Sequence, residues 1–404
     1  MTLRGIRGFP ADTAASAVLF ASLFAAQAGV IAVTPVLAEV GRDLNVSTAV
    51  AGQLRTVTGL TAAIVALTLR GVSGRVGLGR QLLAASLLLA LGSLASGAAS
   101  SFALLALAQV PIGGAIGIFT TGALLAAADW FPTERRQAAL SLALIGQPAA
   151  WIVGMPLVGA LGDHSWRYGL AFPLVAALVA GVAVVSRVGE PPTHVPATSL
   201  RAVLSYRGVA RWLGAEFLSN TAWAGVLVFS GALFVESYGV SPRVSGLGLA
   251  AGALGYVGGN RLARELHGDR SSLYLPGLAI ALAVAVLSFG ALRASFAVSI
   301  GLLAISAFLA GARTLVSSSY GLSFPAHVRP AAMGSRAATM QFGYLGGSTL
   351  GGLALVIGGY TGLGVVLGAL LLAAAAVLVL PFRSPTRQIE AERAVSDGLG
   401  SCTA

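Results

Sequence analysis

Long apolar stretches separated by short polar connections follow one another along nearly the whole chain. Each stretch is about 20 residues long, the length that an α-helix needs to cross roughly 30 Å of hydrocarbon. The pattern predicts twelve spans, at 15–38, 49–70, 81–100, 102–127, 137–161, 168–187, 210–236, 243–262, 272–292, 296–322, 332–357 and 361–381. The expected fold class is therefore an all-α membrane protein.

One polar connection, at 188–209, is longer than the others and divides the spans into six and six. The last residues of the chain are rich in charge and serine, which is typical of a disordered tail. The expected organisation is a cytoplasmic N-terminus at 1–14, a six-helix bundle at 15–187, a linker at 188–209, a second bundle at 210–382 and a disordered tail at 383–404.

The two halves carry a weak internal repeat in one register. Matches at a separation of 193 or 194 residues are Val46-Ser47-x-x-Val50 with Val240-Ser241-x-x-Val244, Phe131-Pro132 and Arg136 with Phe324-Pro325 and Arg329, and Gly154 and Gly159 with Gly347 and Gly352. A parallel repeat of six spans predicts two pseudo-symmetric bundles related by an axis along the membrane normal, whereas other transporter folds use inverted repeats.

Composition and charge agree with lipid surroundings and predict an orientation. The chain of 404 residues is 56% hydrophobic and 10% charged, with a mean hydropathy of +0.86. Its net charge of +11 is the excess of 25 arginines over 14 acidic residues, and the chain contains no lysine. If the N-terminus is cytoplasmic, 19 arginines, Arg336 among them, fall on the cytoplasmic side and 4 fall outside. We therefore expect a multi-pass inner-membrane protein with both termini in the cytoplasm.

Residues for enzyme chemistry or metal binding are scarce. The absence of lysine excludes a Walker loop and a Schiff base. Cys402 is the only cysteine, and the four histidines are scattered over the connections. We expect no catalytic residue, no metal site and no cofactor, and therefore no enzyme. We also expect a monomer embedded in the lipid bilayer, with no nucleic-acid partner.

The connection after the second span and the fifth span carry motifs of a known family. Gly74-Arg75-Val76-Gly77-x-x-Arg80 follows the second span, and Gly146-x-Pro148, Gly154-Met-Pro156-x-x-Gly159 and Ser165-Trp166-Arg167 lie in and after the fifth. From 15 to 382 the chain resembles the major facilitator superfamily, and within it the twelve-span drug and sugar efflux group of drug:proton antiporters. The resemblance implies the major facilitator fold. It also implies gating roles for Arg75, Gly77, Arg80, Asp129, Gly154, Pro156 and Gly159, with an inner-gate ion pair between Asp129 and Arg75.

Two positions depart from the pattern of that group. Gly74 stands where the family has an aspartate that helps to lock the outward-open state. Gln109 precedes the spaced glycines Gly113 and Gly117 of the fourth span, where efflux members carry an arginine that is associated with proton coupling.

Ionisable residues inside the predicted spans are the sharpest functional signal. A charge at the bilayer centre costs roughly 2.5–3.5 kcal/mol, so it is usually retained for a reason. Glu216 and Arg313 lie at similar depth on spans that line the cavity in this fold, and we expect them to face each other. Glu216 is then either the proton-responsive group or part of a fixed pair, unless it snorkels to the inner interface. Arg55 is expected to snorkel toward Glu39 or Asp43, with an outer anion-attracting site as the alternative.

Sparse polar and aromatic side chains on apolar helices suit a small amphiphilic substrate. Each such residue alone is more often an interhelical hydrogen bond than a ligand contact. Besides Glu216 and Arg313, the candidates for the substrate and proton site are Gln27, Gln109, Gln147, Asn220, Trp223, Tyr320 and Gln341, and Trp151 and Tyr344 extend the set. Small residues four apart, such as Gly113/Gly117 and Gly255/Gly259, predict close helix packing.

The expected function is secondary active export of a small drug, sugar or metabolite by alternating access, with protons as the coupling ion and antibiotic resistance as the associated phenotype. Two alternatives stay open. The protein takes up or exchanges an organic anion through cavity arginines, or it is a facilitator-like sensor or scaffold that does not transport.

Overall fold

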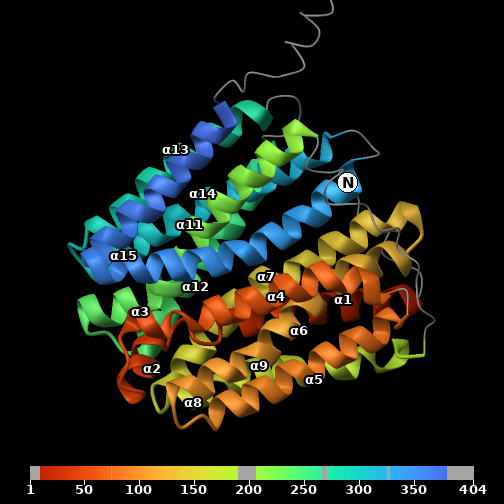
Figure 1. Ribbon diagram of the computed structural model, residues 1–404, viewed down its shortest axis with the longest axis horizontal. Coiled ribbons are helices and arrows are strands. Elements are labelled where there is room, and N and C mark those ends of the chain that lie inside the picture. The colour runs from red at the N-terminus through yellow and green to blue at the C-terminus, as the bar shows by residue number, and fades with distance from the viewer. Residues whose placement is uncertain (1–9, 74, 190–205, 266–270, 325–327, 380–404) are drawn as a thin grey trace, which may run out of the picture.

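The computed structural model describes residues 10–73, 75–189, 206–265, 271–324 and 328–379, and these residues are almost entirely helical (Figure 1). In chain order the helices are α1 (Pro10–Ile31), α2 (Leu37–Asp43), α3 (Thr48–Ala51), α4 (Leu54–Ser73), α5 (Leu78–Gly97), α6 (Phe102–Asp129), α7 (Thr133–Gly162), α8 (Trp166–Gly169), α9 (Ala171–Val184), α11 (Arg207–Tyr238), α12 (Pro242–Leu262), α13 (Ser271–Ala291), α14 (Phe296–Leu322) and α15 (Arg329–Val379). The predicted tail and most of the predicted linker and N-terminal segment lie outside the described residues.

The described helices account for the twelve predicted spans. Ten of them are long and apolar enough to cross a membrane. One of these, α15, contains two spans, because its backbone leaves helical geometry at Gly358 and Gly359. Gly359 has a φ of +56°, which a residue with a Cβ rarely adopts. The remaining span is α12, which is 21 residues long, rich in glycine and packed against α7 and α14.

The first two spans are interrupted rather than continuous. After α1 ends at Ile31, a turn over residues 32–36 precedes α2, and α3 is separated from α4 by Gly52 and Gln53. Pro35 explains the first break, since it lacks an N–H group and disfavours a helical conformation at the residue before it. The turn meets the second half of the chain: a Cβ on Gly231 of α11 would lie 2.1 Å from the carbonyl oxygen of Thr34.

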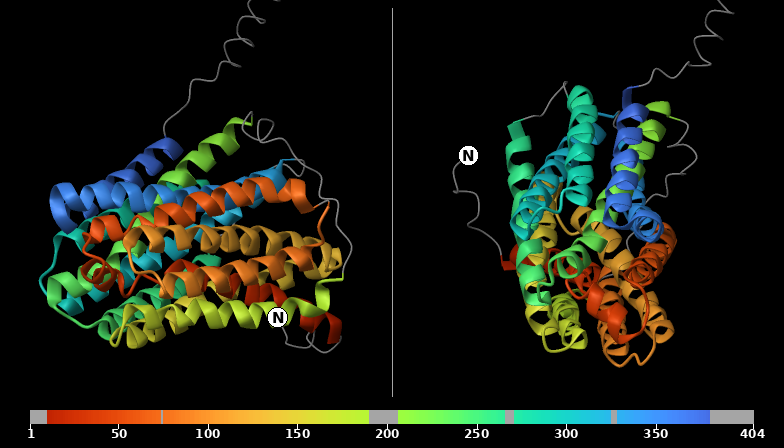
Figure 2. Two further views of the ribbon diagram at one scale, coloured as in Figure 1. Left: turned by 60° about the horizontal axis from the view of Figure 1, so that its bottom comes forward. Right: turned by 90° about the vertical axis from the view of Figure 1, so that its left-hand side faces the viewer.

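The helices form two bundles that contact each other along two seams. In the first bundle α5 and α4 pack against α6, and α1 packs against α7; in the second, α11 packs against α15 and α12 against α14. The seams between the bundles are α7 with α12 and α4 with α15. In Figure 1 the bundles lie close together at the left and diverge toward the right, and the end-on view of Figure 2 shows one above the other.

The internal repeat of the sequence has a structural basis. Ser47 and Ser241 each begin a helix by accepting a hydrogen bond from the N–H of Val50 and Val244. Arg136 Nε donates to the carbonyl oxygen of Phe131 at 3.0 Å, and Arg329 Nε donates to that of Phe324 at 3.2 Å. Equivalent bonds at the predicted separation confirm that the two halves share one parallel topology.

The predicted small-residue pairs bring helix backbones together between equivalent helix pairs of the two bundles. A Cβ on Gly113 of α6 would lie 2.5 Å from Thr58 O of α4, and one on Gly259 of α12 would lie 1.9 Å from Phe308 O of α14. No side chain fits at such separations, so glycine sets how closely these helices approach.

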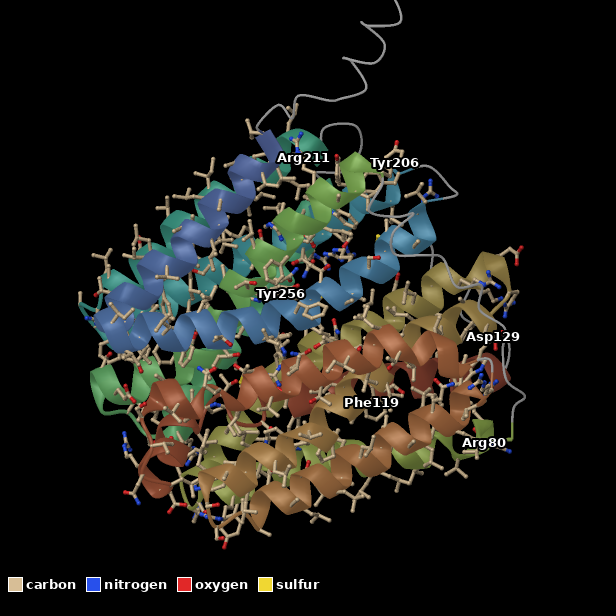
Figure 3. The ribbon with its side chains drawn as sticks, in the orientation of Figure 1. Arg80, Phe119, Asp129, Tyr206, Arg211 and Tyr256 are labelled. Atoms are coloured by element: carbon tan, nitrogen blue, oxygen red, sulfur yellow. The ribbon has the colours of Figure 1, made fainter. Side chains whose placement is uncertain are left out.

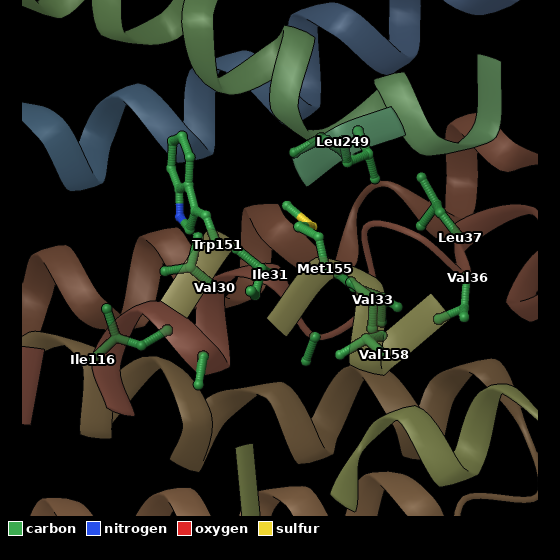
Figure 4. Packing of buried hydrophobic residues seen from close by; sticks show 14 of the residues in the cluster. Val30, Ile31, Val33, Val36, Leu37, Ile116, Trp151, Met155, Val158 and Leu249 are labelled. Atoms are coloured by element: carbon green, nitrogen blue, oxygen red, sulfur yellow. The ribbon is translucent and has the colours of Figure 1, made fainter. Parts of the chain in front are cut away.

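An apolar core extends from the first bundle across the α7–α12 seam (Figure 4). Ile31, Val158 and Met155 pack in the same cluster as Leu249, which belongs to α12 of the second bundle. Trp151, which is 8% exposed, projects from α7 toward the second bundle. This seam therefore brings one large aromatic side chain to the boundary between the halves.

Candidate functional site

Arg55 lies in the first turn of α4 and is 2% exposed. Its Nε, Nη1 and Nη2 atoms have no hydrogen-bond partner, and no described carboxylate forms an ion pair with it. Its Cζ instead lies 4.7 Å from the ring centroid of Tyr344, on α15 of the other bundle. The fork of N–H donors is thus buried against an aromatic ring at the α4–α15 seam.

The expected snorkelling of Arg55 is not observed. Glu39 pairs with Arg42, and Asp43 pairs with Arg167, so the two proposed acceptors are engaged elsewhere. One turn below Arg55, a Cβ on Gly59 would lie 2.8 Å from the backbone nitrogen of Leu345. Because α4 and α15 cross this closely, the guanidinium group is held between the helices and below the protein surface.

Aromatic rings from both bundles extend this site. The centroid of the Trp151 ring lies 5.5 Å from that of Tyr256 on α12, and Tyr256 stacks on Trp223 of α11 at 6.3 Å. The side chains of Tyr256 and Tyr344 lie close enough to interact electrostatically. Figure 3 shows Tyr256 near the middle of the molecule, where the bundles meet.

Further polar groups without partners accompany Arg55. The side-chain amide of Gln27 of α1 lies within hydrogen-bonding range of the Tyr344 hydroxyl. Neither Nε1 of Trp151 nor Oε1 of Gln341 has a partner, although both residues are buried. We refer to Arg55, Gln27, Trp151, Trp223, Tyr256, Gln341 and Tyr344 as the Arg55 cluster. Buried polar groups are normally paired, so a set of unpaired ones at one seam is a candidate ligand site.

A second buried charge cluster lies wholly within the second bundle. Arg313 Nη2 donates to Glu216 Oε1 at 2.6 Å, and Arg336 Nε donates to Glu216 Oε2 at 2.7 Å. The side chains of Glu216, Arg313 and Arg336 are 1%, 5% and 11% exposed. Glu216 and Arg313 therefore face each other as predicted, and Glu216 does not snorkel. One carboxylate shared by two guanidinium groups leaves this Glu216 triad with a net charge of +1.

Hydrogen bonds between the bundles lie in the half of the molecule that the arginine distribution predicts to be outside, which we call the outer half. Gln53 Nε2 donates to Ser348 O at 3.0 Å, and the Thr56 hydroxyl lies 2.8 Å from that of Ser348 and 3.1 Å from that of Thr349. Nearer the surface, Thr48 donates to Glu236, and the backbone N–H of Arg243 donates to Asp163 at 2.9 Å. We call these contacts the outer gate. The outer gate thus joins described residues in or next to α3, α4 and α7 to residues of α11, α12 and α15.

The residues that the family motif assigns to gating fall at both ends of the first bundle. Gly77 is the N-cap residue of α5, and Arg80 donates to the carbonyl oxygen of Val188 at 3.2 Å. Arg80 and Asp129 lie at the same end in Figure 3. Arg75 and Asp129 are both exposed, and an ion pair between them stays a prediction.

The predicted gating residues of the fifth span lie elsewhere. α7 continues as one helix through Pro148 and Pro156. A Cβ on Gly154 would meet Phe172 of the first bundle, whereas one on Gly159 would lie 2.4 Å from Pro242 O of α12. Gly159 therefore belongs to the outer half of the seam between the bundles.

Four other predicted site residues make local contacts or none. Gln109 donates to Ser96 of α5 at 3.1 Å, and Asn220 donates to the carbonyl oxygen of Glu216 at 2.8 Å. The Tyr320 ring packs on Phe324 at 5.3 Å. Gln147 is half-buried, one turn before Trp151 on α7.

Two members of the clusters are absent from the predicted set. Arg336 was counted among the inner connections, but it lies inside α15, because the helix begins at Arg329. Its position within the apolar stretch 332–357 was the available signal. Tyr256 is the one bulky aromatic residue in a glycine-rich stretch, and its small neighbours at Gly252, Gly255 and Gly259 were the clue.

The fold and the matched sequence together decide the family. The sequence model of the family described as the Major Facilitator Superfamily matches residues 19–320 of this chain. The chain belongs to this superfamily. A facilitator is a transporter and not an enzyme, and its setting is a membrane with a small-molecule substrate. No curated protein sequence matches the chain at a significant level.

Solved structures of facilitators share the fold. A bacterial homolog of the human lysosomal transporter Spinster, inward-facing and unoccupied, has a TM-score of 0.69 at 15% identity and covers 92% of this chain and 95% of that one. A D-xylose–proton symporter has a TM-score of 0.72 at 17% identity, covering 91% and 97%. The human organic anion transporter MFSD10 (TETRAN) has a TM-score of 0.67 at 17% identity, covering 92% and 100%. At such identities the likeness concerns the fold alone.

Proposed function

We propose that this facilitator is a secondary active transporter that exports a small amphiphilic compound by alternating access, with inward proton movement as the energy source. One observation carries the transport part. The outer gate joins the bundles in the outer half, and the Arg55 cluster extends from the same turn of α4 to Tyr256 near the middle of the molecule. Alternating access requires a site that is closed on one side while the other side can open.

On this proposal the present state is closed outside and open inside. The hydrogen bonds of the outer gate and the divergence of the bundles toward the other end in Figure 1 support this assignment. Both termini and the arginine-rich connections then face the cytoplasm.

The Glu216 triad is the proposed proton-responsive group. Protonation of Glu216 removes the one negative charge that holds Arg313 and Arg336 together, so the two guanidinium groups are released. Because the acid contacts α14 and α15, this change reaches two helices of the second bundle. One proton moving inward across 100 mV supplies about 2.3 kcal/mol, which supports a substrate gradient of roughly fifty-fold.

The first experiment is a resistance and uptake screen of cells with and without the protein, across antibiotics, sugars and organic anions. Export predicts resistance and lower accumulation of at least one compound. With that compound in proteoliposomes, Glu216→Gln is expected to abolish the dependence of transport on an imposed pH gradient. Glu134→Gln changes an exposed acid on α7 and should leave it intact.

Two results would count against parts of the proposal. Unchanged pH dependence in Glu216→Gln removes the proton role of the triad. If that variant folds poorly, the double variant Glu216→Gln/Arg336→Gln, which removes one charge of each sign, provides the same test. Counterflow that continues in the presence of a protonophore identifies exchange instead of proton-driven export.

A further inference from the structure

We propose that the Arg55 cluster binds an organic anion, with a carboxylate or sulfonate group on Arg55 and an aromatic part against Trp151, Tyr256 and Trp223. The inference rests on the proposed transport function and deepens it by naming the substrate class. It is argued from the donors, the charges and the rings of the cluster.

The guanidinium group of Arg55 is a charge without a counter-charge. It is 2% exposed, and all three of its nitrogen atoms are unpaired. A buried charge without a partner is strongly destabilising, and the ring of Tyr344 offsets only a small part of that effect. An arginine presents five N–H donors in a planar fork that matches both oxygen atoms of a carboxylate or sulfonate.

The neighbouring unpaired groups favour a ligand rich in acceptors. Nε1 of Trp151 is a donor without a partner, and it comes from a helix of the first bundle, as does Arg55. Gln341 Oε1 is the one unpaired acceptor of the cluster, and it comes from the second bundle. A ligand that accepts hydrogen bonds from the first bundle and also contacts the second bundle connects the two parts that move during transport.

Charge distribution disfavours a cation at this place. No described carboxylate pairs with Arg55, and the electrostatic partner of its guanidinium group is Tyr344. On the same helix as Tyr344, Arg336 lies two turns away, or about 12 Å at the rise of an α-helix. The Glu216 triad to which it belongs has a net positive charge. The buried charges near the seam therefore attract an anion and repel a cation.

The rings define the other part of the ligand. Trp151, Tyr256 and Trp223 form a continuous aromatic set, with centroid separations of 5.5 and 6.3 Å. Tyr256 and Trp223 are half-buried, so each leaves part of its ring surface uncovered. Such surfaces bind a flat apolar or aromatic group by stacking and burial.

A set of probes on one ring system tests the inference. Isothermal titration calorimetry of the full chain in detergent compares naphthylsulfonate, naphthylsulfonamide and naphthylmethylammonium, which differ in charge but share the aromatic part. The variants are Arg55→Gln, which removes the charge, and Arg55→Lys, which keeps the charge but loses the fork. Arg211→Gln, at the inner end of α11, is the matched loss of an arginine away from the cluster.

The expected result is that the wild-type chain prefers the sulfonate over both other probes. Arg55→Gln lowers the affinity for the sulfonate by about ten- to a hundred-fold and leaves the affinity for the sulfonamide unchanged. Arg55→Lys is intermediate, and Arg211→Gln binds like the wild type. Without ligand, Arg55→Gln melts at or above the wild-type temperature, because it removes an unpaired buried charge.

The inference is overturned if the folded wild-type chain does not bind the sulfonate, or if it binds the sulfonamide as tightly. It is also overturned if Arg55→Gln melts lower while its affinity for the sulfonate is unchanged, since Arg55 is then a structural support of the α4–α15 seam. If the proposed transport function is wrong but this inference is right, the anion binds through Arg55 but is not transported in proteoliposomes. Flux of a neutral solute without anion binding contradicts this inference alone.

Discussion

Arg55, Arg313 and Arg336 are all largely buried, yet they differ in what neutralises them. Arg313 and Arg336 share the carboxylate of Glu216, whereas Arg55 has only the face of Tyr344. The energetic consequences of substitution differ accordingly. Removing the single acid of the triad leaves two positive charges side by side, whereas removing one arginine leaves a matched pair.

Glu216→Gln is therefore expected to destabilise the protein more than Arg336→Gln. The loss of the acid should cost about 3–5 kcal/mol, because it leaves uncompensated buried charges. The loss of Arg336 should cost about 1–3 kcal/mol, since it leaves one carboxylate oxygen without its donor. Unfolding measured in one detergent for both variants gives the comparison. An equal or larger loss in Arg336→Gln would show that the triad is not held together by Glu216.

Asp43 gives a prediction about pH outside the spans. Hydrogen bonds from Trp166 Nε1 and Arg167 hold the pKa of Asp43 below its ordinary value. A depressed folded-state pKa stabilises the fold above the ordinary pKa of about 3.9, and this contribution is lost as the pH falls through the folded pKa. Melting curves across that range should show less acid destabilisation in Asp43→Asn than in the wild type. Because Asp43 is 47% exposed, the effect is small. Parallel curves would contradict it.

At the scale of elements, glycine decides how the helices approach one another. Gly113 and Gly117 of α6 contact the backbone of α4, and Gly255 and Gly259 of α12 contact that of α14. The two contacts join equivalent helix pairs of the repeat, although the glycines lie on the fourth span in one bundle and on the eighth in the other. The same device therefore builds both bundles, and a side chain at any of these positions has to push two helices apart.

Gly259→Ala should be destabilising by about 1–3 kcal/mol, because its Cβ would lie 1.9 Å from Phe308 O. Gly301→Ala on the partner helix α14 is the matched control, since nothing lies within 4 Å of a Cβ there. The control should be neutral or stabilising by up to about 1 kcal/mol, as alanine favours the helix. Thermal unfolding of both variants checks this. A control that is as unstable as Gly259→Ala would remove the packing argument.

The sequence predicted where the helices lie along the chain better than which side chains each helix presents to its neighbours. Apolar length located all twelve spans, and the repeat predicted the parallel halves in which the structure shows matching caps and arginine contacts. The break near Pro35 follows from its missing N–H group, whereas the break near Gly52 lies where the chain meets Phe229 of the other bundle. The burial of Arg55 depends on the α4–α15 crossing, which a single sequence does not contain. The contact between Glu216 and Arg313 was predictable because two opposite charges at one depth have few other partners.

At the scale of the whole molecule, the hydrogen bonds of the outer gate join the two bundles in the outer half, and Arg55 and Gln27 contact Tyr344 across the seam. Gln53, Thr56 and Ser348 form the centre of the outer gate, and α7 and α12 continue toward the opposite end without a hydrogen bond between them. If the bundles move as units, weakening the outer gate must favour closure at the inner end. This coupling is the central claim, and it can be tested without knowing the substrate.

The most direct test is the distance between spin labels at the inner ends of the two bundles. The label sites are Glu134→Cys on α7 and Arg261→Cys on α12, both exposed, with the native cysteine replaced by Cys402→Ser. The chain with an intact outer gate should give one long distance. Adding Gln53→Ala and Thr56→Ala should create a second, shorter population. An unchanged distance distribution after loss of the outer gate would contradict alternating access by these two bundles.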